Sequence, residues 1–209
     1  MTDPALEDHI ESEIIPRYAH FDKAHDIAHV RSVIERSLAL ARARGADERT
    51  AYVVAAYHDT GLIAGRERHH LVSGEILAAD PVLRRFFPPA AIALMREAVE
   101  DHRASAARPP RNLYGRIVAA ADRLIDPDTV FRRTVQYGLA HYPALDREAH
   151  FRRFRDHLLE KYAAGGYLRL PHDDTDNLRR LDALRRLLGD PATLRTAFDR
   201  LYDAERETR

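Results

Sequence analysis

The chain has 209 residues, of which 45% are hydrophobic and 32% charged, a composition typical of a folded globular protein rather than a disordered one. Basic and acidic residues both number 33, so no excess of positive charge indicates a nucleic-acid partner. The absence of cysteine excludes disulfides and thiolate metal sites. The sequence has neither an apolar run of about 18 residues that would span a membrane nor a signal-peptide pattern over residues 1–10, so we expect a cytoplasmic protein.

The first two thirds of the sequence predict helices separated by glycine and proline. A first helix is expected over residues 5–20, and a second over 27–41, where apolar residues recur every three or four positions before Gly45. Residues 51–57 predict a third helix that is apolar nearly all round and therefore buried. Further helices are expected over 69–79, 89–103, 112–125 and 127–141, with a loop over 104–111.

The sequence beyond Pro143 predicts a second group of helices. One long helix covers residues 146–164, and a loop follows over 167–174. A stripe of leucines over residues 178–188 indicates an amphipathic helix that serves either the core or the seam of a homodimer, and a last helix follows Pro191. We therefore expect an all-α protein with a helical core over residues 1–140 and a C-terminal helical extension over 141–209, packed on the same domain.

Three of the predicted helices carry ionisable side chains in apolar surroundings. His29 lies in the second helix, His58 and Asp59 follow the buried third helix, and Asp122 lies in the apolar segment 117–125. Burying such groups is costly unless they are paired or bound to a metal ion. Without thiolates, an imidazole and carboxylate site would suit Mn, Fe, Co, Ni or Zn without a strong preference.

With these residues the sequence resembles the HD-domain superfamily of metal-dependent phosphohydrolases. The signature of that family is a histidine, an adjacent His-Asp pair and a distant aspartate, each on a different helix. The segments that resemble these elements, in order and within residues 22–130, are Ala28-His29-Val30, Tyr57-His58-Asp59-Thr60 and Ala121-Asp122-Arg123. The resemblance implies an all-helical HD-type bundle and a metal centre at these residues. The glycine-lysine that often follows His-Asp in relatives is Gly61-Leu62 here.

Many relatives carry two further histidines that hold a second metal ion. His102 resembles one of them, and His69 and His70 both fit the spacing of the other; we prefer His69. The resemblance thus implies one or two divalent ions per chain, with Mn, Fe, Co, Ni, Zn and Mg all open. The implied donors are His29, His58, Asp59, His69, His102 and Asp122.

The activity implied by the resemblance is hydrolysis of a phosphate ester or phosphoanhydride in a nucleotide or related small metabolite. A bound divalent ion lowers the pKa of its water from about 15.7 towards about 7, so that a metal-bound hydroxide can attack phosphorus near neutral pH. We expect His58 and Asp59 to be the catalytic residues, with Asp59 bridging two ions.

Three more residues are candidates for contact with the small phosphorylated substrate, which is the expected partner. His25 precedes His29 by one helical turn and is expected either at the substrate phosphate or in a solvated or capping role. Arg123 follows Asp122 and is expected at the substrate or in an ion pair behind the ligands. Lys161 precedes Gly165-Gly166, a segment that forms either a lid over the pocket or only a helix stop.

Two other functions remain open at this point. Some HD relatives use the same six donors as a di-iron centre that activates oxygen, and dependence of turnover on iron and oxygen would indicate that class. A metal-bound but inactive module that senses a nucleotide would instead bind nucleotides without turnover.

Overall fold

The computed structural model describes residues 3–22, 24–103, 108–123, 125–168, 170 and 174–207. Within these ranges the chain forms ten α-helices and no strand, which confirms the predicted all-α fold. Parts of the two expected long loops, residues 104–107, 169 and 171–173, lie outside the described residues. None of the described helices combines the length and the apolar character needed to cross a membrane. The chain divides into two compact units, Met1–Arg123 and Leu124–Arg209.

Unit 1 begins with three short helical segments where the sequence predicts one helix. The α-helix α1 (Pro4–His9) passes into a π-helical turn, η1 (Ile10–Ile14), and then into a 3-10 helix, η2 (Ile15–His20). Pro16 explains the change, because proline has no N–H for an α-helical hydrogen bond and its ring crowds the preceding turn. The segment still buries Leu6, Ile10, Ile14 and Tyr18 on one face.

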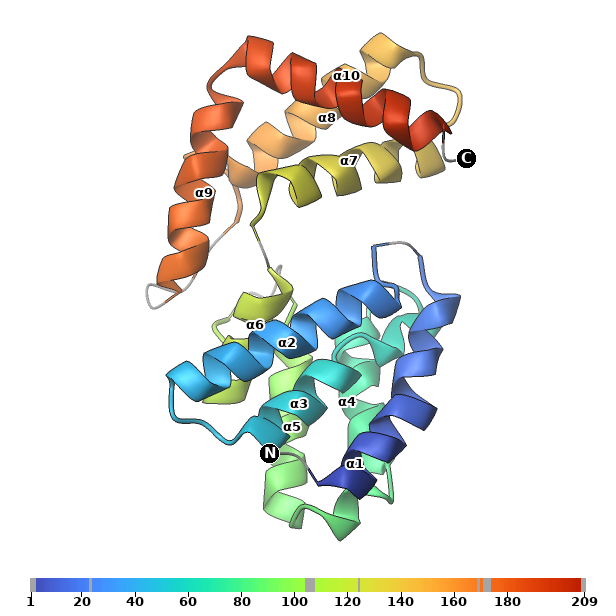
Figure 1. Cartoon of the computed structure of the whole chain (residues 1–209), viewed down its shortest axis with the longest axis vertical. Coiled ribbons are helices and arrows are strands. Elements are labelled where there is room, and N and C mark those ends of the chain that lie inside the picture. The colour runs from blue at the N-terminus through green and yellow to red at the C-terminus, as the bar shows by residue number, and fades with distance from the viewer. Residues whose placement is uncertain are drawn as a thin grey trace. The chain divides into compact units, whose positions relative to one another are not determined.

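Helix α3 (Glu48–Tyr57) is the centre of unit 1. Asp47 caps its first turn by accepting hydrogen bonds from the backbone N–H groups of Arg49 and Thr50. Every residue from Thr50 to Tyr57 is buried, as expected for a helix that is apolar all round. Figure 1 shows it among its neighbours, and it packs against η1, α2 (Ile27–Ala43), α4 (His69–Ala79), α5 (Pro89–Glu100) and α6 (Leu113–Asp122).

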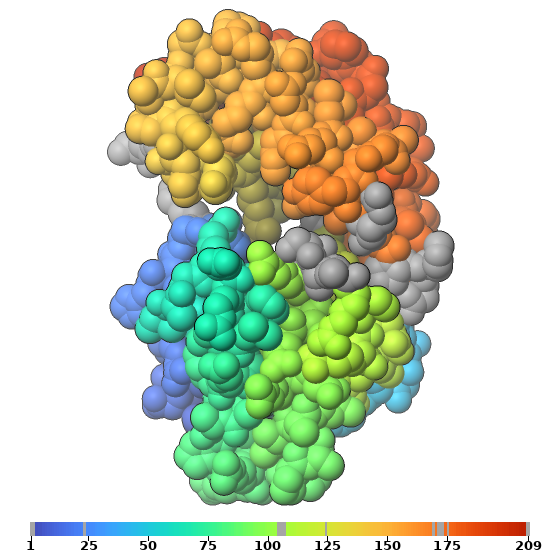
Figure 2. Space-filling view, turned by 180° about the vertical axis from the view of Figure 1, so that it is seen from behind, coloured from blue at the N-terminus to red at the C-terminus, as the bar shows by residue number. Residues whose placement is uncertain are grey.

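Short 3-10 helices connect α3, α4 and α5. η3 (Thr60–Ala64) leads from α3 into α4, and η4 (Leu83–Arg85) leads from α4 into α5. Residues of α4 and α5 lie side by side on the face of unit 1 seen in Figure 2, in turquoise to green. The two helices run antiparallel, because His69 at the start of α4 and His102 just beyond the end of α5 are in contact.

Unit 2 consists of α7 (Pro127–His141), α8 (Arg147–Tyr162), α9 (Thr175–Leu188) and α10 (Pro191–Glu207) around a separate core. The division at residues 123 and 124 precedes α7, whereas the sequence places the boundary near residue 140. The physical reason is that Phe131 and Val135 of α7 are buried in the core of unit 2. Leu184 of the leucine stripe is also fully buried in this core, so the stripe serves the core, and a homodimer stays a prediction.

Candidate metal centre

The end of α3 is held in place by a buried tyrosine from the N-terminal segment. The hydroxyl of Tyr18 donates a hydrogen bond to the carbonyl of Ala56 (2.9 Å) and accepts one from the backbone N–H of Asp59 (3.2 Å). The hydroxyl of Thr60 donates to the carbonyl of Tyr57 (2.8 Å). Because these bonds satisfy backbone groups that a helix end leaves unpaired, they fix the turn that carries the His-Asp pair.

Four predicted donors meet at one side of this turn. His29, near the start of α2, has its Nε2 atom 3.3 Å from Nε2 of His58 and 3.3 Å from Oδ1 of Asp122 at the end of α6. Oδ2 of Asp59 lies 3.2 Å from Nε2 of His58 and 3.6 Å from Nε2 of His29. We call His29, His58, Asp122 and Oδ2 of Asp59 the first half-site.

A second group shares Asp59 with the first. Its other oxygen, Oδ1, lies 3.4 Å from Nε2 of His69 and 3.4 Å from Nε2 of His102, and the two imidazole nitrogens are 3.3 Å apart. We call Oδ1 of Asp59, His69 and His102 the second half-site. Each oxygen of one carboxylate therefore faces a different pair of histidines, as expected of a residue that bridges two ions.

His70, the alternative to His69, belongs to neither donor group among the described residues. Its ring packs edge-on against that of His69, with 5.6 Å between the ring centres. The small residue one turn after His69 explains how that histidine is placed. Ser73 accepts a hydrogen bond at its Oγ from the N–H of Gly61 (2.8 Å), which ties the start of α4 to η3. The geometry thus favours His69 as the donor.

Three of the histidines are oriented by a hydrogen bond to the backbone carbonyl three residues earlier. Nδ1 of His58 lies 2.7 Å from the carbonyl oxygen of Ala55. Nδ1 of His69 lies 2.7 Å from the carbonyl oxygen of Arg66, and Nδ1 of His102 lies 2.6 Å from that of Val99. A carbonyl can only accept a hydrogen bond, so Nδ1 carries the proton in each case. Nε2 then presents its lone pair to the centre, which is the state that a metal ligand requires.

The charges in the centre favour a cation. Burial would raise the pKa of Asp59, but the neighbouring His58, His102 and His29 hold that pKa well below its usual value. Burial likewise opposes ionisation of Asp122, whose pKa is nevertheless lowered, chiefly by its hydrogen bond with His29. Both carboxylates are therefore ionised at neutral pH.

The histidines respond to these carboxylates in different ways. Burial and the proximity of His102 lower the pKa of His69 to about 4, so this side chain is neutral at neutral pH. Burial also acts to lower the pKa of His58, but the charges of Asp59 and Asp122 outweigh it and raise that pKa. The two carboxylates thus favour positive charge at the centre, and a bound divalent cation would supply that charge.

The distances between donors also fit a metal ion. Nitrogen and oxygen donors about 2.0–2.2 Å from one ion are about 3–3.6 Å from each other, and within each half-site most of the observed separations fall in this range. The residues present therefore fit a divalent metal in composition, charge and spacing.

The candidate substrate residues lie in different places. His25 lines the pocket beside the donors, and its ring packs edge-on against His29 with 5.7 Å between the ring centres. Arg123 donates hydrogen bonds to the carbonyls of His102 (3.5 Å) and Arg103 (3.2 Å), so it braces the segment that carries a donor. Lys161 lies on α8 in unit 2, and its contact with substrate stays a prediction.

The pocket beside the donors has a volume of about 350 Å³, and Arg66 and Arg103 contribute to its lining. Neither arginine follows from the motif residues. Their positions in the sequence contain a signal, because Arg103 follows His102 and Arg66 precedes His69 by three residues. A basic residue this close in sequence to a donor is positioned by the same stretch of backbone as the donor.

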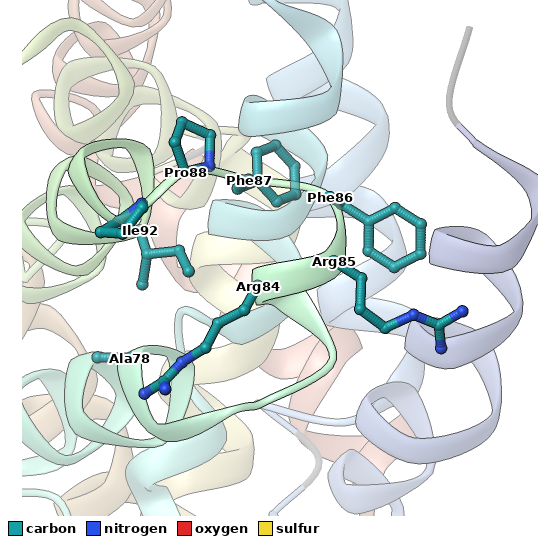
Figure 3. Close-up of a pocket in the computed structure, with 8 residues that line it drawn as sticks. Ala78, Arg84, Arg85, Phe86, Phe87, Pro88 and Ile92 are labelled. Carbon is teal, nitrogen blue, oxygen red and sulfur yellow. The ribbon is translucent and has the colours of Figure 1, made fainter.

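A larger hollow, of about 660 Å³, lies at the opposite end of α4 and α5 (Figure 3). Ala78 of α4 and Ile92 of α5 contribute to its walls, together with Arg84 of η4. Ala78 follows His69 by nine residues, which corresponds to roughly 13 Å along a helix. Neither histidine nor carboxylate is among the described residues that line this hollow, so it is not the metal centre.

Comparisons with known proteins agree with this geometry. Residues 26–125 match the HD domain family model, and all six donors lie within them. Among solved structures, the chain is similar to a predicted HD superfamily hydrolase from an uncultured Thermotogales bacterium, with a TM-score of 0.51 and 22% identity over 73% of this chain and 84% of that chain. At this identity the likeness shows the fold, and no curated protein matches the sequence. The family match and the all-helical fold agree that residues 26–125 form an HD domain.

Proposed function

We propose that this protein is a metal-dependent phosphohydrolase that cleaves phosphate esters or phosphoanhydrides of small, nucleotide-like molecules. The observation that carries the proposal is the position of Asp59, whose two oxygens each face a separate pair of histidines. The match of residues 26–125 to the HD domain family supports it, because HD domains bind divalent metals. The structural neighbour is itself a predicted hydrolase, which is consistent with the proposal.

The two half-sites offer different sets of donors to a metal ion. The first half-site offers His29, His58, Asp122 and one oxygen of Asp59, and the second offers the other oxygen with two histidines. A divalent ion bound there supplies a water of lowered pKa and stabilises negative charge on phosphoryl oxygens. With three protein donors rather than four, the second half-site leaves more room for a substrate oxygen.

The pocket supports a phosphorylated substrate. Arg66, Arg103 and His25 line it together with the donors, and guanidinium groups bind phosphate through paired hydrogen bonds. Arg123 acts on substrate only indirectly in this arrangement, by holding the backbone that carries His102. We expect His58 and Asp59 to be indispensable, because each is a central donor.

The test is a reconstitution experiment. The purified protein is stripped of metal, loaded separately with Mn, Fe, Co, Ni, Zn or Mg, and assayed for phosphate release from nucleotides and simple phosphoesters. We expect release with at least one metal and none in the stripped protein or in Asp59→Asn. Turnover that consumes oxygen and requires iron would instead indicate the di-iron oxygenase. Tight nucleotide binding without release under all six metals would indicate a sensing module.

A further inference from the structure

The pocket carries positive charge on its solvent side in addition to the metal donors at its base. Arg66 and Asp59 both line it, but the side chain of Arg66 is 55% exposed and that of Asp59 only 5%. Arg103 also contributes to the lining and is half-buried. The arginines therefore lie further out than the carboxylate that the two half-sites share.

Arg103 has hydrogen-bonding capacity that the described residues do not use. Its Nη1 group donates to the backbone carbonyl of Glu67 (2.7 Å), which anchors the guanidinium beside the start of α4. No carboxylate among the described residues lies within ion-pair distance of it. Because a guanidinium has five N–H groups, an anchored and uncompensated one is suited to an incoming anion.

Arg66 is only loosely engaged. Its Nη2 group lies 3.3 Å from Oδ2 of Asp22 and also contacts the ring of His25. Asp22 is 53% exposed, and its other oxygen is 2.7 Å from Nδ1 of His25. Such an exposed ion pair contributes little to stability, so Arg66 can turn towards a ligand at small cost.

The lining indicates recognition by charge. At about 350 Å³, the pocket is near the lower end of the range of about 300–1,000 Å³ for small-molecule sites, so a substrate that reaches the donors extends to the arginines within a few bonds. Leu62 is the only apolar side chain among the described residues that line it, and none of them is phenylalanine, tyrosine or tryptophan. The described lining therefore offers little surface for stacking a flat apolar group.

On the basis of the proposed function, we propose that Arg66 and Arg103 bind a second anionic group of the substrate. The substrate is then a small phosphorylated compound with a further phosphate or a carboxylate a few bonds from the phosphoryl group that is removed. The metal donors at the base serve the reacting phosphoryl group, and the two arginines serve the second anion.

Two phosphonates test this without turnover, since their carbon–phosphorus bond is not a phosphoester. Phosphonoacetate carries a carboxylate where ethylphosphonate carries a methyl group, so the pair isolates the second anion. Both are titrated calorimetrically into the protein with and without Mn²⁺. In the presence of Mn²⁺, we expect phosphonoacetate to bind about tenfold more tightly than ethylphosphonate. Arg103→Gln should bring the two affinities together, whereas Arg84→Gln, at an exposed arginine of η4 away from the pocket, should keep the wild-type ratio.

The outcomes separate this inference from the function on which it rests. Equal wild-type affinities for the two phosphonates, both dependent on Mn²⁺, would overturn the inference and leave the metal-dependent function standing. A preference for phosphonoacetate that persists in both Arg103→Gln and Arg66→Gln would also overturn it. If the preference disappears in Arg103→Gln but Mn²⁺ affects neither affinity, the anion site is supported and the metal-dependent function is contradicted.

Discussion

The hydroxyl of Tyr18 accepts a hydrogen bond from the backbone N–H of Asp59, although the two residues are 41 positions apart in the sequence. Tyr18 lies on η2, before the segment that matches the HD domain family, and its side chain is fully buried. The N-terminal helical segment therefore contributes directly to the position of the shared carboxylate.

Tyr18→Phe should weaken metal binding by about tenfold, because the groups that hold metal ligands typically contribute 10- to 100-fold to affinity. The matched control is Tyr57→Phe, which removes another tyrosine hydroxyl, one that donates a hydrogen bond to the carboxylate of Asp80 (2.5 Å). Both variants should be less stable to urea, but only Tyr18→Phe should show weaker Mn²⁺ binding by calorimetry. Equal metal affinities in the two folded variants would mean that Tyr18 has only a structural role.

The shared carboxylate predicts the stoichiometry of metal binding. Wild-type protein should approach two ions per chain in adequate metal, and His102→Ala should lower the value towards one, measured by elemental analysis after dialysis. His70→Ala is the control, because His70 lies outside both donor groups and should leave the stoichiometry unchanged. Saturation of the wild-type protein at one ion, with His69→Ala and His102→Ala both silent, would reduce the centre to its first half-site.

The two aspartates should differ when each is replaced by asparagine. Asp59→Asn removes a charged donor from both half-sites, so metal content and phosphate release should both fall by orders of magnitude. Asp122→Asn affects only the first half-site, and the protein should keep part of its bound metal. A variant Asp59→Asn with wild-type metal content would contradict the bridging role.

Gly61→Ala should unfold or strongly destabilise unit 1. A Cβ at this position would lie 2.2 Å from the carbonyl oxygen of His69 and 2.5 Å from the backbone nitrogen of Ser73. Because both are backbone atoms of α4, the helix must move away from η3, at a cost of about 3 kcal/mol or more. Gly165→Ala, where a Cβ meets no atom within 4 Å, is the control and should leave the urea midpoint nearly unchanged.

The contribution of Asp80 to stability should depend on pH. Burial acts to raise the pKa of Asp80, but hydrogen bonds with Tyr57 and His9 outweigh it and lower that pKa. A lowered folded-state pKa gives stability that is present above the unfolded value, about 3.9, and is lost as the pH falls through the folded value.

Asp80→Asn should therefore reduce the free energy of unfolding by about 1–3 kcal/mol at pH 7, and the difference from wild type should shrink below about pH 4. Urea titrations of both proteins at a series of pH values measure this. A difference that stays constant down to pH 3 would show that the ionised carboxylate is not the stabilising group.

Ionisable residues in or beside apolar helices indicate four of the candidate donors, and the family resemblance adds His69 and His102. The fold brings all six side chains together. His58 and Asp59 could be placed from the apolar helix before them, and Asp122 from the apolar helix that it ends. Spacing alone does not separate His69, the preferred donor, from His70, since both fit it. The difference between them lies in contacts with His102 and Asp59 across the fold. Arg66 and Arg103 are not part of the motif, and their only local signal is that they lie close in sequence to His69 and His102.

The same distinction holds for the architecture. The helices follow from periodicity and from the proline and glycine positions, but the division of the chain before α7 depends on which core receives Phe131. The packing of α7 against α8 and α10 decides this, and local sequence patterns do not reveal that packing. Tyr18 is a further case, because its role requires a partner on another helix.

The backbone bonds of His58, His69 and His102 affect how the centre tolerates substitution. Many metal sites orient their histidines through carboxylate side chains, and a single replacement of such a carboxylate frees the ring. Here the acceptor is the main-chain carbonyl three residues earlier, which every amino acid possesses. Side chains at positions 55, 66 and 99 can therefore vary without loss of the acceptor, provided that the local backbone is kept, so the direction of these three ligands is a property of the fold.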